Sequence, residues 1–363
     1  IYIISIMMQS LAGVLGFHLW ATGRVVTQGL GSIIGSIVFR VSEVTLIIML
    51  HNVYAIALSS ALNYTITSVY YLTRVRSLPN LILGYRTLKT RAKSFLSFGF
   101  QYWLASYLGA AFSNLIAYLI FKILGPSFSG IYSIANTALG LLVSFSGTVS
   151  SVFGSLAAHG LGTGVELRGL SRDYAQASLA VAGLLSMIGV LFTPLLPMLH
   201  IFNGNYAEAV PYLMFLIGTT PLSAVDGIYM MYYWVSGKGW LAVERTLAGS
   251  ITNVALFVLL VNKLGLYAAI LGTYAGAAVT MILYWINNKP WGFKIGITSV
   301  LSVLFPVLSA LLFVVYDPVL KWPTPQLILL IAFTLIMVAI KPVKKEVIED
   351  APRFLKLILK AFT

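Results

Sequence analysis

Long apolar runs dominate the chain, and short polar segments separate them. Runs of 18 or more mostly apolar residues recur along the whole length, each long enough to cross the hydrocarbon core of a bilayer. Apolar residues follow one another instead of alternating with polar ones over about ten residues, so the pattern predicts helices and not barrel strands. We therefore expect an all-α, polytopic membrane protein. The eleven predicted spans are residues 1–21, 29–50, 52–72, 96–121, 128–157, 174–198, 210–235, 240–262, 264–286, 297–316 and 325–341.

The amino-acid composition supports the membrane-protein class and excludes several kinds of functional site. Charged residues make up 9% of the chain, against about 25% in soluble domains. Cysteine is absent, which excludes disulfides and thiolate metal sites. The sequence contains no P-loop, no cluster with metal-ligand spacing and no nucleophile elbow. We therefore expect no ATP hydrolysis, no cofactor, no metal and no catalytic residues, and predict that the chain is not an enzyme.

The positive charges predict the orientation of the spans. Alternate connections and the C-terminal tail hold 19 of the 23 Lys and Arg residues, and the opposite side has only Lys122, Lys263 and Lys321. Cytoplasmic loops of membrane proteins carry such an excess. We expect a multi-pass protein of the cell membrane with a cytoplasmic C-terminus. The net charge of +13 is then a topology signal, and nucleic-acid binding is not expected.

An internal repeat predicts the domain organisation. Residues 53–72 align with residues 266–285 at a shift of 213, with five identities that include the pair Tyr71 and Tyr284. The repeat predicts two pseudo-symmetric six-helix lobes plus two C-terminal helices in the parent protein, with the first three helices missing here. The predicted segments are 1–72, the second half of the N-lobe; 73–95, a basic cytoplasmic linker; 96–290, the C-lobe; 291–343, two further helices; and 344–363, an amphipathic cytoplasmic tail.

Several motifs resemble one transporter family. The basic linker is followed by "FGF" (98–100), a helix, "LGPSFSGIYSIA" (124–135) and a helix rich in Ser and Thr. This order resembles the seventh and eighth helices of polysaccharide, or O-antigen, flippases, whose superfamily also contains multidrug extruders and lipid II flippases. "FNGNYAEAVPYLMFL" (202–216) resembles the family's short element before the tenth helix. The resemblance implies a monomer that flips a polyprenyl-(di)phosphate-linked oligosaccharide by alternating access among membrane lipids, and Na⁺ or H⁺ is a candidate coupling partner.

Arg40 is the first candidate site residue, because it lies deep within a predicted span. An arginine at the bilayer centre costs roughly 2.5–3.5 kcal/mol on insertion scales, so it must face protein or water. Ser32, Ser36, Arg40 and Glu43 share one helix face. Two interpretations stay open: Glu43 neutralises Arg40 within a packed bundle, or Arg40 binds an anionic headgroup such as a diphosphate while Glu43 acts in gating.

Asp226 is the second candidate, on the predicted span 210–235. Thr219, Ser223, Tyr229 and Tyr233 share its stripe, and Pro221 is expected to kink or open the helix nearby. A neighbouring hydroxyl could satisfy the carboxylate. Alternatively, Asp226 is a coupling site for a proton or Na⁺, or a partner that pairs with Arg40 during transport.

Three polar residues are candidates for sugar contact. Asn114 and Asn136 lie on consecutive antiparallel spans, and Ser144 belongs to a stripe of small hydroxyl residues. For the serine stripe, close helix packing through small residues is the competing interpretation.

Three other functions remain open from the sequence. A Na⁺- or H⁺-coupled multidrug extruder shares the fold, and Asp226 gives it some support. A glycan polymerase or ligase would require a large outer loop, whereas the longest predicted outer connection is only residues 199–209. A non-transporting scaffold would follow if the gene product truly lacked the first three helices.

Overall fold

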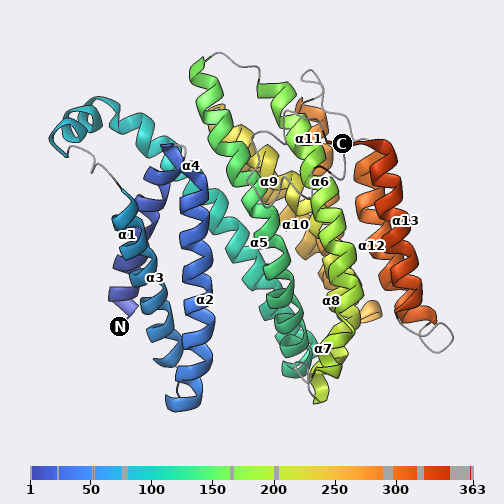
Figure 1. Cartoon of the computed structure of the whole chain (residues 1–363). Coiled ribbons are helices and arrows are strands. Elements are labelled where there is room, and N and C mark those ends of the chain that lie inside the picture. Colours follow the sequence, from blue (N-terminus) through green and yellow to red (C-terminus); the bar gives the residue numbers. More distant parts are fainter. Residues whose placement is uncertain are drawn as a thin grey trace. The chain divides into compact units, whose positions relative to one another are not determined.

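The computed structural model describes residues 2–22, 24–50, 52, 54–75, 81–163, 167–199, 204–288, 297–316, 323–343 and 360 (Figure 1). The chain divides into two compact units, residues 1–92 and 93–363. Within the described ranges the regular structure is helical throughout, with no strand.

The first unit contains three membrane-length helices. They are α1 (Tyr2–Ala21), α2 (Val25–Leu50) and α3 (Tyr54–Arg74), and α3 packs against both of the others. Leu15, Leu19 and Tyr71 form its small buried core. The Tyr71 hydroxyl donates a 2.8 Å hydrogen bond to the carbonyl oxygen of Gln28, which ties α3 to the beginning of α2.

The second unit contains the remaining helices, and α4 crosses from one unit into the other. In order these are α4 (Leu81–Leu124), α5 (Pro126–Thr163), α6 (Leu167–Phe192), α7 (Leu195–Met198), the 3₁₀ turn η1 (Gly204–Glu208), α8 (Ala209–Ile217), α9 (Thr220–Val235), α10 (Gly239–Leu264), α11 (Tyr267–Asn288), α12 (Ile297–Tyr316) and α13 (Thr324–Ile340). The α5 helix packs against α6, α8 and α9, while α12 packs against α6 and α13.

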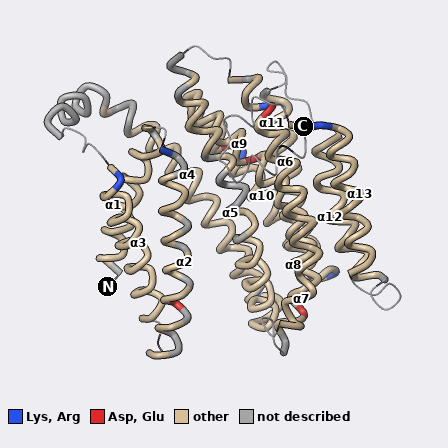
Figure 2. Tube along the Cα trace, viewed as in Figure 1, with Lys and Arg blue, Asp and Glu red and all other residues tan. Residues whose placement is uncertain are grey.

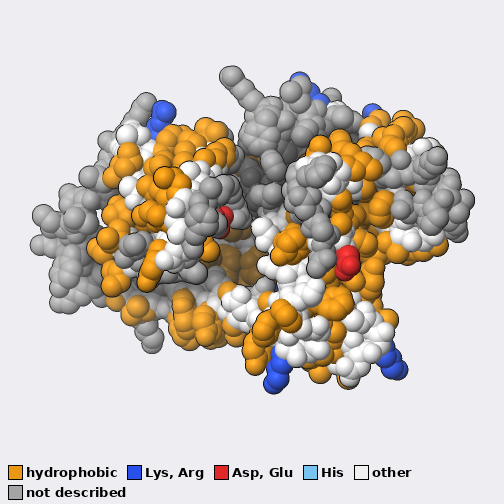
Figure 3. Space-filling model, turned by 90° about the horizontal axis from the view of Figure 1, so that it is seen from below, with side chains coloured by type: hydrophobic (Ala, Val, Ile, Leu, Met, Phe, Trp, Pro, Cys, Tyr) orange, Lys and Arg blue, Asp and Glu red, His pale blue; other side chains and the backbone are white. Residues whose placement is uncertain are grey.

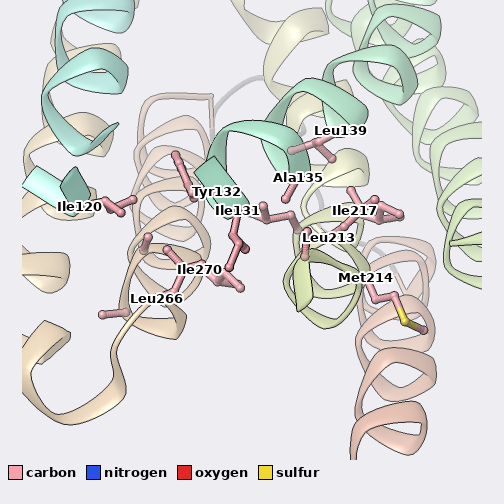
Figure 4. Close-up of a cluster of buried hydrophobic side chains, with 14 of the residues drawn as sticks. Ile120, Ile131, Tyr132, Ala135, Leu139, Leu213, Met214, Ile217, Leu266 and Ile270 are labelled. Carbon is pink, nitrogen blue, oxygen red and sulfur yellow. The ribbon is translucent and has the colours of Figure 1, made fainter. Parts of the chain in front are cut away.

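A cluster of buried aliphatic side chains holds one end of this unit together (Figure 4). Ile120 of α4, Ile131 of α5, Leu213 of α8 and Ile270 of α11 meet in it. Four helices that are separate in the chain therefore share one apolar core, and Tyr132 of α5 is buried there as well.

Several of the helices have the length and polarity of membrane spans. Six described helices are long and apolar enough to cross a membrane, or seven if the bent α8–α9 pair is one span. Figure 2 shows that most of the described chain carries no charged residue, and Figure 3 shows hydrophobic side chains over much of the face that it presents. The protein is an all-α, polytopic membrane protein, as the hydrophobic pattern predicted.

Helix boundaries differ from the expected ones in identifiable places. All eleven predicted spans fall on helices, but α4 begins at Leu81, so part of the predicted linker 73–95 is helical. That segment is basic but rich in Leu, Lys and Arg, which favour helices. The predicted amphipathic tail lies outside the described residues apart from Lys360. The lobe organisation and the missing helices stay predictions.

The predicted span 210–235 is broken, near the position that Pro221 indicated. The axes of α8 and α9 differ by 47° across the break, and Pro221 occupies the first turn of α9, where its missing N–H costs no helical bond. At the break the carbonyl oxygen of Phe215 accepts a 3.1 Å bond from the Gly218 N–H, and the Tyr274 hydroxyl of α11 donates a second bond of 2.7 Å to it. This contact anchors α11 at the bend.

Small residues bring α10 and α11 into close contact. A Cβ atom at Gly276 would lie 2.5 Å from the carbonyl oxygen of Gly249, and one at Gly272 would lie 2.6 Å from that of Asn253. Both distances are far below van der Waals contact, so the two backbones approach each other only because these residues are glycines. The α10–α11 hairpin is consequently a tightly packed body.

Candidate functional site

The α2 candidates lie on the helix that the sequence predicted for them. Arg40 is in α2, but its side chain lies outside the described residues, and Glu43 is half-buried on the same helix. Ile37 and Val41 of the same helix are 58% and 63% exposed. Ser32, on the predicted polar stripe, lies 3.2 Å from the Tyr71 hydroxyl of α3. At least one member of the stripe therefore contacts protein.

The sugar-contact candidates occupy α4 and α5. Asn114 of α4 and Asn136 of α5 are both exposed, and no described hydrogen bond joins them. Ser144 lies in α5, and its side chain is outside the described residues. The two amides are thus available to a ligand, whereas nothing places Ser144 beside them.

Asp226 has a partner that its own helix did not reveal. The Tyr284 hydroxyl of α11 donates a 2.6 Å hydrogen bond to the Oδ1 atom of Asp226 on α9. Asp226 remains partly exposed, while Tyr284 is completely buried. The hydroxyl partner that the sequence analysis allowed thus exists, but it comes from a helix nearly sixty residues away. The described partners of Asp226 are Tyr284 of α11 and Arg245 of α10.

Arg245 is the functional candidate that sequence reasoning missed. It is one of the 19 positive residues that the sequence assigned to connections and the C-terminal tail, but it lies in the second turn of α10 and is 1% exposed. Its Nη1 group donates to the carbonyl oxygen of Leu241. Its Nε and Nη2 groups are buried and have no hydrogen-bond partner among the described residues. The sequence did contain a signal, because residue 245 lies inside the predicted span 240–262.

Aromatic rings surround the Arg245 charge. Its guanidinium carbon lies 4.1 Å from the ring centre of Tyr233 and 4.8 Å from that of Tyr284, both within cation–π range. The two rings are nearly parallel, with an interplanar angle of 13°. The ring centre of Tyr229 lies 5.2 Å from that of Tyr284. Asp226 and Arg245 also interact electrostatically. We call Asp226, Tyr229, Tyr233, Arg245 and Tyr284 the Asp–Arg–Tyr cluster.

The first unit contains an uncharged counterpart of this cluster. At the shift of 213, Tyr71 corresponds to Tyr284 and Ser32 to Arg245, and each tyrosine contacts its α2 or α10 residue. Gly16 stands where α9 has Tyr229, and a Cβ atom there would lie 3.3 Å from the Tyr71 ring. The repeated tyrosine thus packs similarly in both units, but only the second unit adds an aspartate and an arginine.

The arrangement combines two charges and three phenols within helices of membrane-spanning length. Asp226 belongs to the bent α8–α9 pair, and Arg245 and Tyr284 belong to two further candidate spans. Ionisable residues at such positions are expensive to insert and typically mark a transport or coupling pathway. In the described part of the chain no group of His, Asp and Glu has the arrangement of a metal site. The cluster can bind a small ion or exchange hydrogen-bond partners.

Comparison with known proteins identifies one family. The family model described as "Polysaccharide biosynthesis protein" matches residues 27–210, which extend from α2 into α8 and cover just over half of the chain. No match to a curated protein or to a solved structure is found. The chain belongs to the polysaccharide biosynthesis protein family.

Proposed function

We propose that the protein is a transporter that flips a polyprenyl-(di)phosphate-linked oligosaccharide from the cytoplasmic to the outer leaflet of the cell membrane. Membership of a polysaccharide biosynthesis family supports a role in the synthesis or export of a glycan. A glycan assembled on a lipid carrier must cross the bilayer, and a polytopic helical protein is suited to that step. The mechanism is alternating access between the two membrane faces.

The observation that carries this proposal is the Asp–Arg–Tyr cluster inside spanning helices of a chain from this family. Each charge in the hydrocarbon region costs roughly 2.5–3.5 kcal/mol on insertion scales. A purely structural helix bundle could replace both charges with apolar residues. Transport offers a reason for keeping them, because a transporter must change its polar contacts during each cycle.

The remaining candidates are assigned by chemistry. Arg40 binds the phosphate, since a guanidinium matches phosphate oxygens in a bidentate manner. Asn114 and Asn136, both exposed, and Ser144 bind sugar hydroxyls. Asp226 is the site at which Na⁺ or H⁺ is coupled, with Glu43 as a gating residue. The protein works as a monomer with its C-terminus in the cytoplasm, and it is not an enzyme.

Purified protein in liposomes that contain a fluorescent polyprenyl-diphosphate oligosaccharide tests this function. A membrane-impermeant quencher reports how fast inner-leaflet label reaches the outer leaflet. We expect protein-dependent exposure that is lost in Arg40→Ala and partly kept in Arg40→Lys. Lys263→Ala, a change at an exposed residue of α10, serves as the matched control and leaves the rate unchanged. Exposure equal to that of empty liposomes would contradict the proposal.

A multidrug extruder coupled to Na⁺ or H⁺ is the second candidate, and an acidic residue, Asp226, within the bent α8–α9 pair favours it. The same liposomes separate the two functions. Export of a cationic dye down an imposed ion gradient, without any exposure of the labelled lipid, would support the extruder. Arg40 would then be a structural partner of Glu43.

A further inference from the structure

The Asp–Arg–Tyr cluster contains an unusual pairing. Asp226 accepts a hydrogen bond from a neutral tyrosine, while the nearby Arg245 keeps two buried nitrogen groups without an acceptor among the described residues. Buried charged donors without partners are strongly unfavourable. A carboxylate and a guanidinium in the same apolar surroundings are expected to pair directly. The observed contacts therefore leave an alternative arrangement available to the same side chains.

The three helices of the cluster are not equally connected. Arg245 and Tyr284 both belong to the α10–α11 hairpin, whose glycine contacts make it one tightly packed body. Asp226 belongs to α9, which contacts α10 and α11 much less than it contacts α5 and α6. The bond between Tyr284 and Asp226 is consequently a polar attachment between two bodies.

A second polar attachment lies at the bend between α8 and α9. There the Tyr274 hydroxyl bonds to the carbonyl oxygen of Phe215. Tyr274 and Tyr284 are ten residues apart on α11, which corresponds to about 15 Å along the helix axis. A hairpin that pivots at Tyr274 would therefore move most relative to α9 at Tyr284 and Arg245.

We propose that Asp226 exchanges partners between Tyr284 and Arg245, and that this exchange moves the α10–α11 hairpin against α9. In the arrangement seen here, Tyr284 connects α9 to α11. In the other arrangement, the Asp226 carboxylate bonds to the Nε and Nη2 groups of Arg245 and connects α9 to α10, and the Tyr284 hydroxyl is released. Arg245 is thus a positioning residue for Asp226. The exchange adds a structural step to the transport function proposed above. Only its role in the transport cycle rests on that function.

The uncharged counterpart in the first unit supports this assignment. Tyr71 has Ser32 and the carbonyl of Gln28 as partners, and both lie on α2. With both partners on one helix, Tyr71 offers no exchange between helices. In the second unit, Asp226 has possible partners on two helices, Tyr284 on α11 and Arg245 on α10, and the first unit has no equivalent arrangement.

Distance measurements between two spin labels test the exchange without any transport assay. The chain has no cysteine, so labels can be placed at Ala158→Cys on α5 and Ile286→Cys on α11, both exposed positions. The α5 helix packs against α9 and serves as the fixed reference. Tyr284→Phe keeps the ring and removes the hydroxyl, which leaves Asp226 free to pair with Arg245.

We expect Tyr284→Phe to shift the distance between the two labels away from the main distance measured in the labelled protein with Tyr284 intact. Adding Asp226→Asn should reverse that shift, because the amide carries no charge for Arg245, and adding Arg245→Gln should reverse it as well. Tyr267→Phe, a phenol of α11 packed against the hydrophobic cluster, is the control and should change nothing. An unchanged distribution in Tyr284→Phe, or a shift that persists with Asp226→Asn, would overturn the exchange. Because no substrate is present, these outcomes do not depend on whether the protein flips lipid.

Discussion

Tyr284 donates a 2.6 Å hydrogen bond to Asp226, and this bond joins α11 to α9 within the second unit. The acceptor is a carboxyl group, and the donor is completely buried. Hydrogen bonds to charged groups stabilise a fold about twice as much as neutral ones. The relationship therefore matters for stability as well as for the proposed transport cycle.

The two repeated tyrosines should differ in how much they stabilise the protein. Tyr71→Phe removes bonds to neutral groups and should lower the free energy of unfolding by about 0.5–1.5 kcal/mol, whereas Tyr284→Phe removes a bond to a carboxylate and should lower it by about 1.5–3 kcal/mol. Unfolding of each variant in detergent measures the difference. Equal losses would show that the Tyr284 bond to Asp226 is no stronger than the bonds that Tyr71 makes to neutral groups.

Removing the Arg245 charge should be destabilising. Arg245→Leu leaves the Asp226 carboxyl group without its nearby positive charge, and a polar group left uncompensated in an apolar site costs about 1–3 kcal/mol. The double variant Arg245→Leu with Asp226→Leu should recover most of this loss, because neither charge is then left alone. If the double variant were as unstable as the sum of the single changes, the two residues would not be coupled.

The glycines of the α10–α11 hairpin should tolerate no side chain. Gly276→Ala would place Cβ 2.5 Å from the carbonyl oxygen of Gly249, so the helices must separate and the melting temperature should fall. Gly140→Ala in α5 is the matched control, because a Cβ atom there meets nothing within 4 Å. It should leave stability unchanged or raise it slightly, since alanine favours helices more than glycine.

Changes at the two exposed asparagines should weaken recognition of the glycan and leave recognition of the lipid carrier unchanged. Asn114→Ala and Asn136→Ala should slow flipping of a carrier with a long oligosaccharide and leave flipping of a carrier with one sugar nearly unchanged. The reason is that amides bind sugar hydroxyls, whereas the phosphate is assigned to Arg40. Comparing initial rates for the two lipids measures this. Equal slowing for both would place the asparagines outside the glycan path.

The sequence predicted the helices well where hydrophobicity decides the outcome. Each predicted span lies on a helix, and Pro221 indicated the break between α8 and α9. The extended beginning of α4 was missed because residues 81–95 form a helix through backbone propensity while their hydropathy is low.

The candidate site was only partly predictable. Asp226 was found because a carboxylate inside a span is rare. Its partner Tyr284 and the burial of Arg245 depend on how α9, α10 and α11 pack together, which no pattern within one helix can reveal. Arg245 resembled a loop charge, since it lies near a helix end. The internal repeat was the remaining clue, because it aligned Tyr284 with Tyr71.

Flipping itself is tested most directly by purified wild-type protein in liposomes that contain a labelled polyprenyl-diphosphate oligosaccharide. The account predicts that an impermeant quencher will reach the inner-leaflet label much faster than in empty liposomes, and that Asp226→Asn will slow this exposure. Exposure at the rate of empty liposomes, from protein that is folded and correctly inserted, would contradict the central claim.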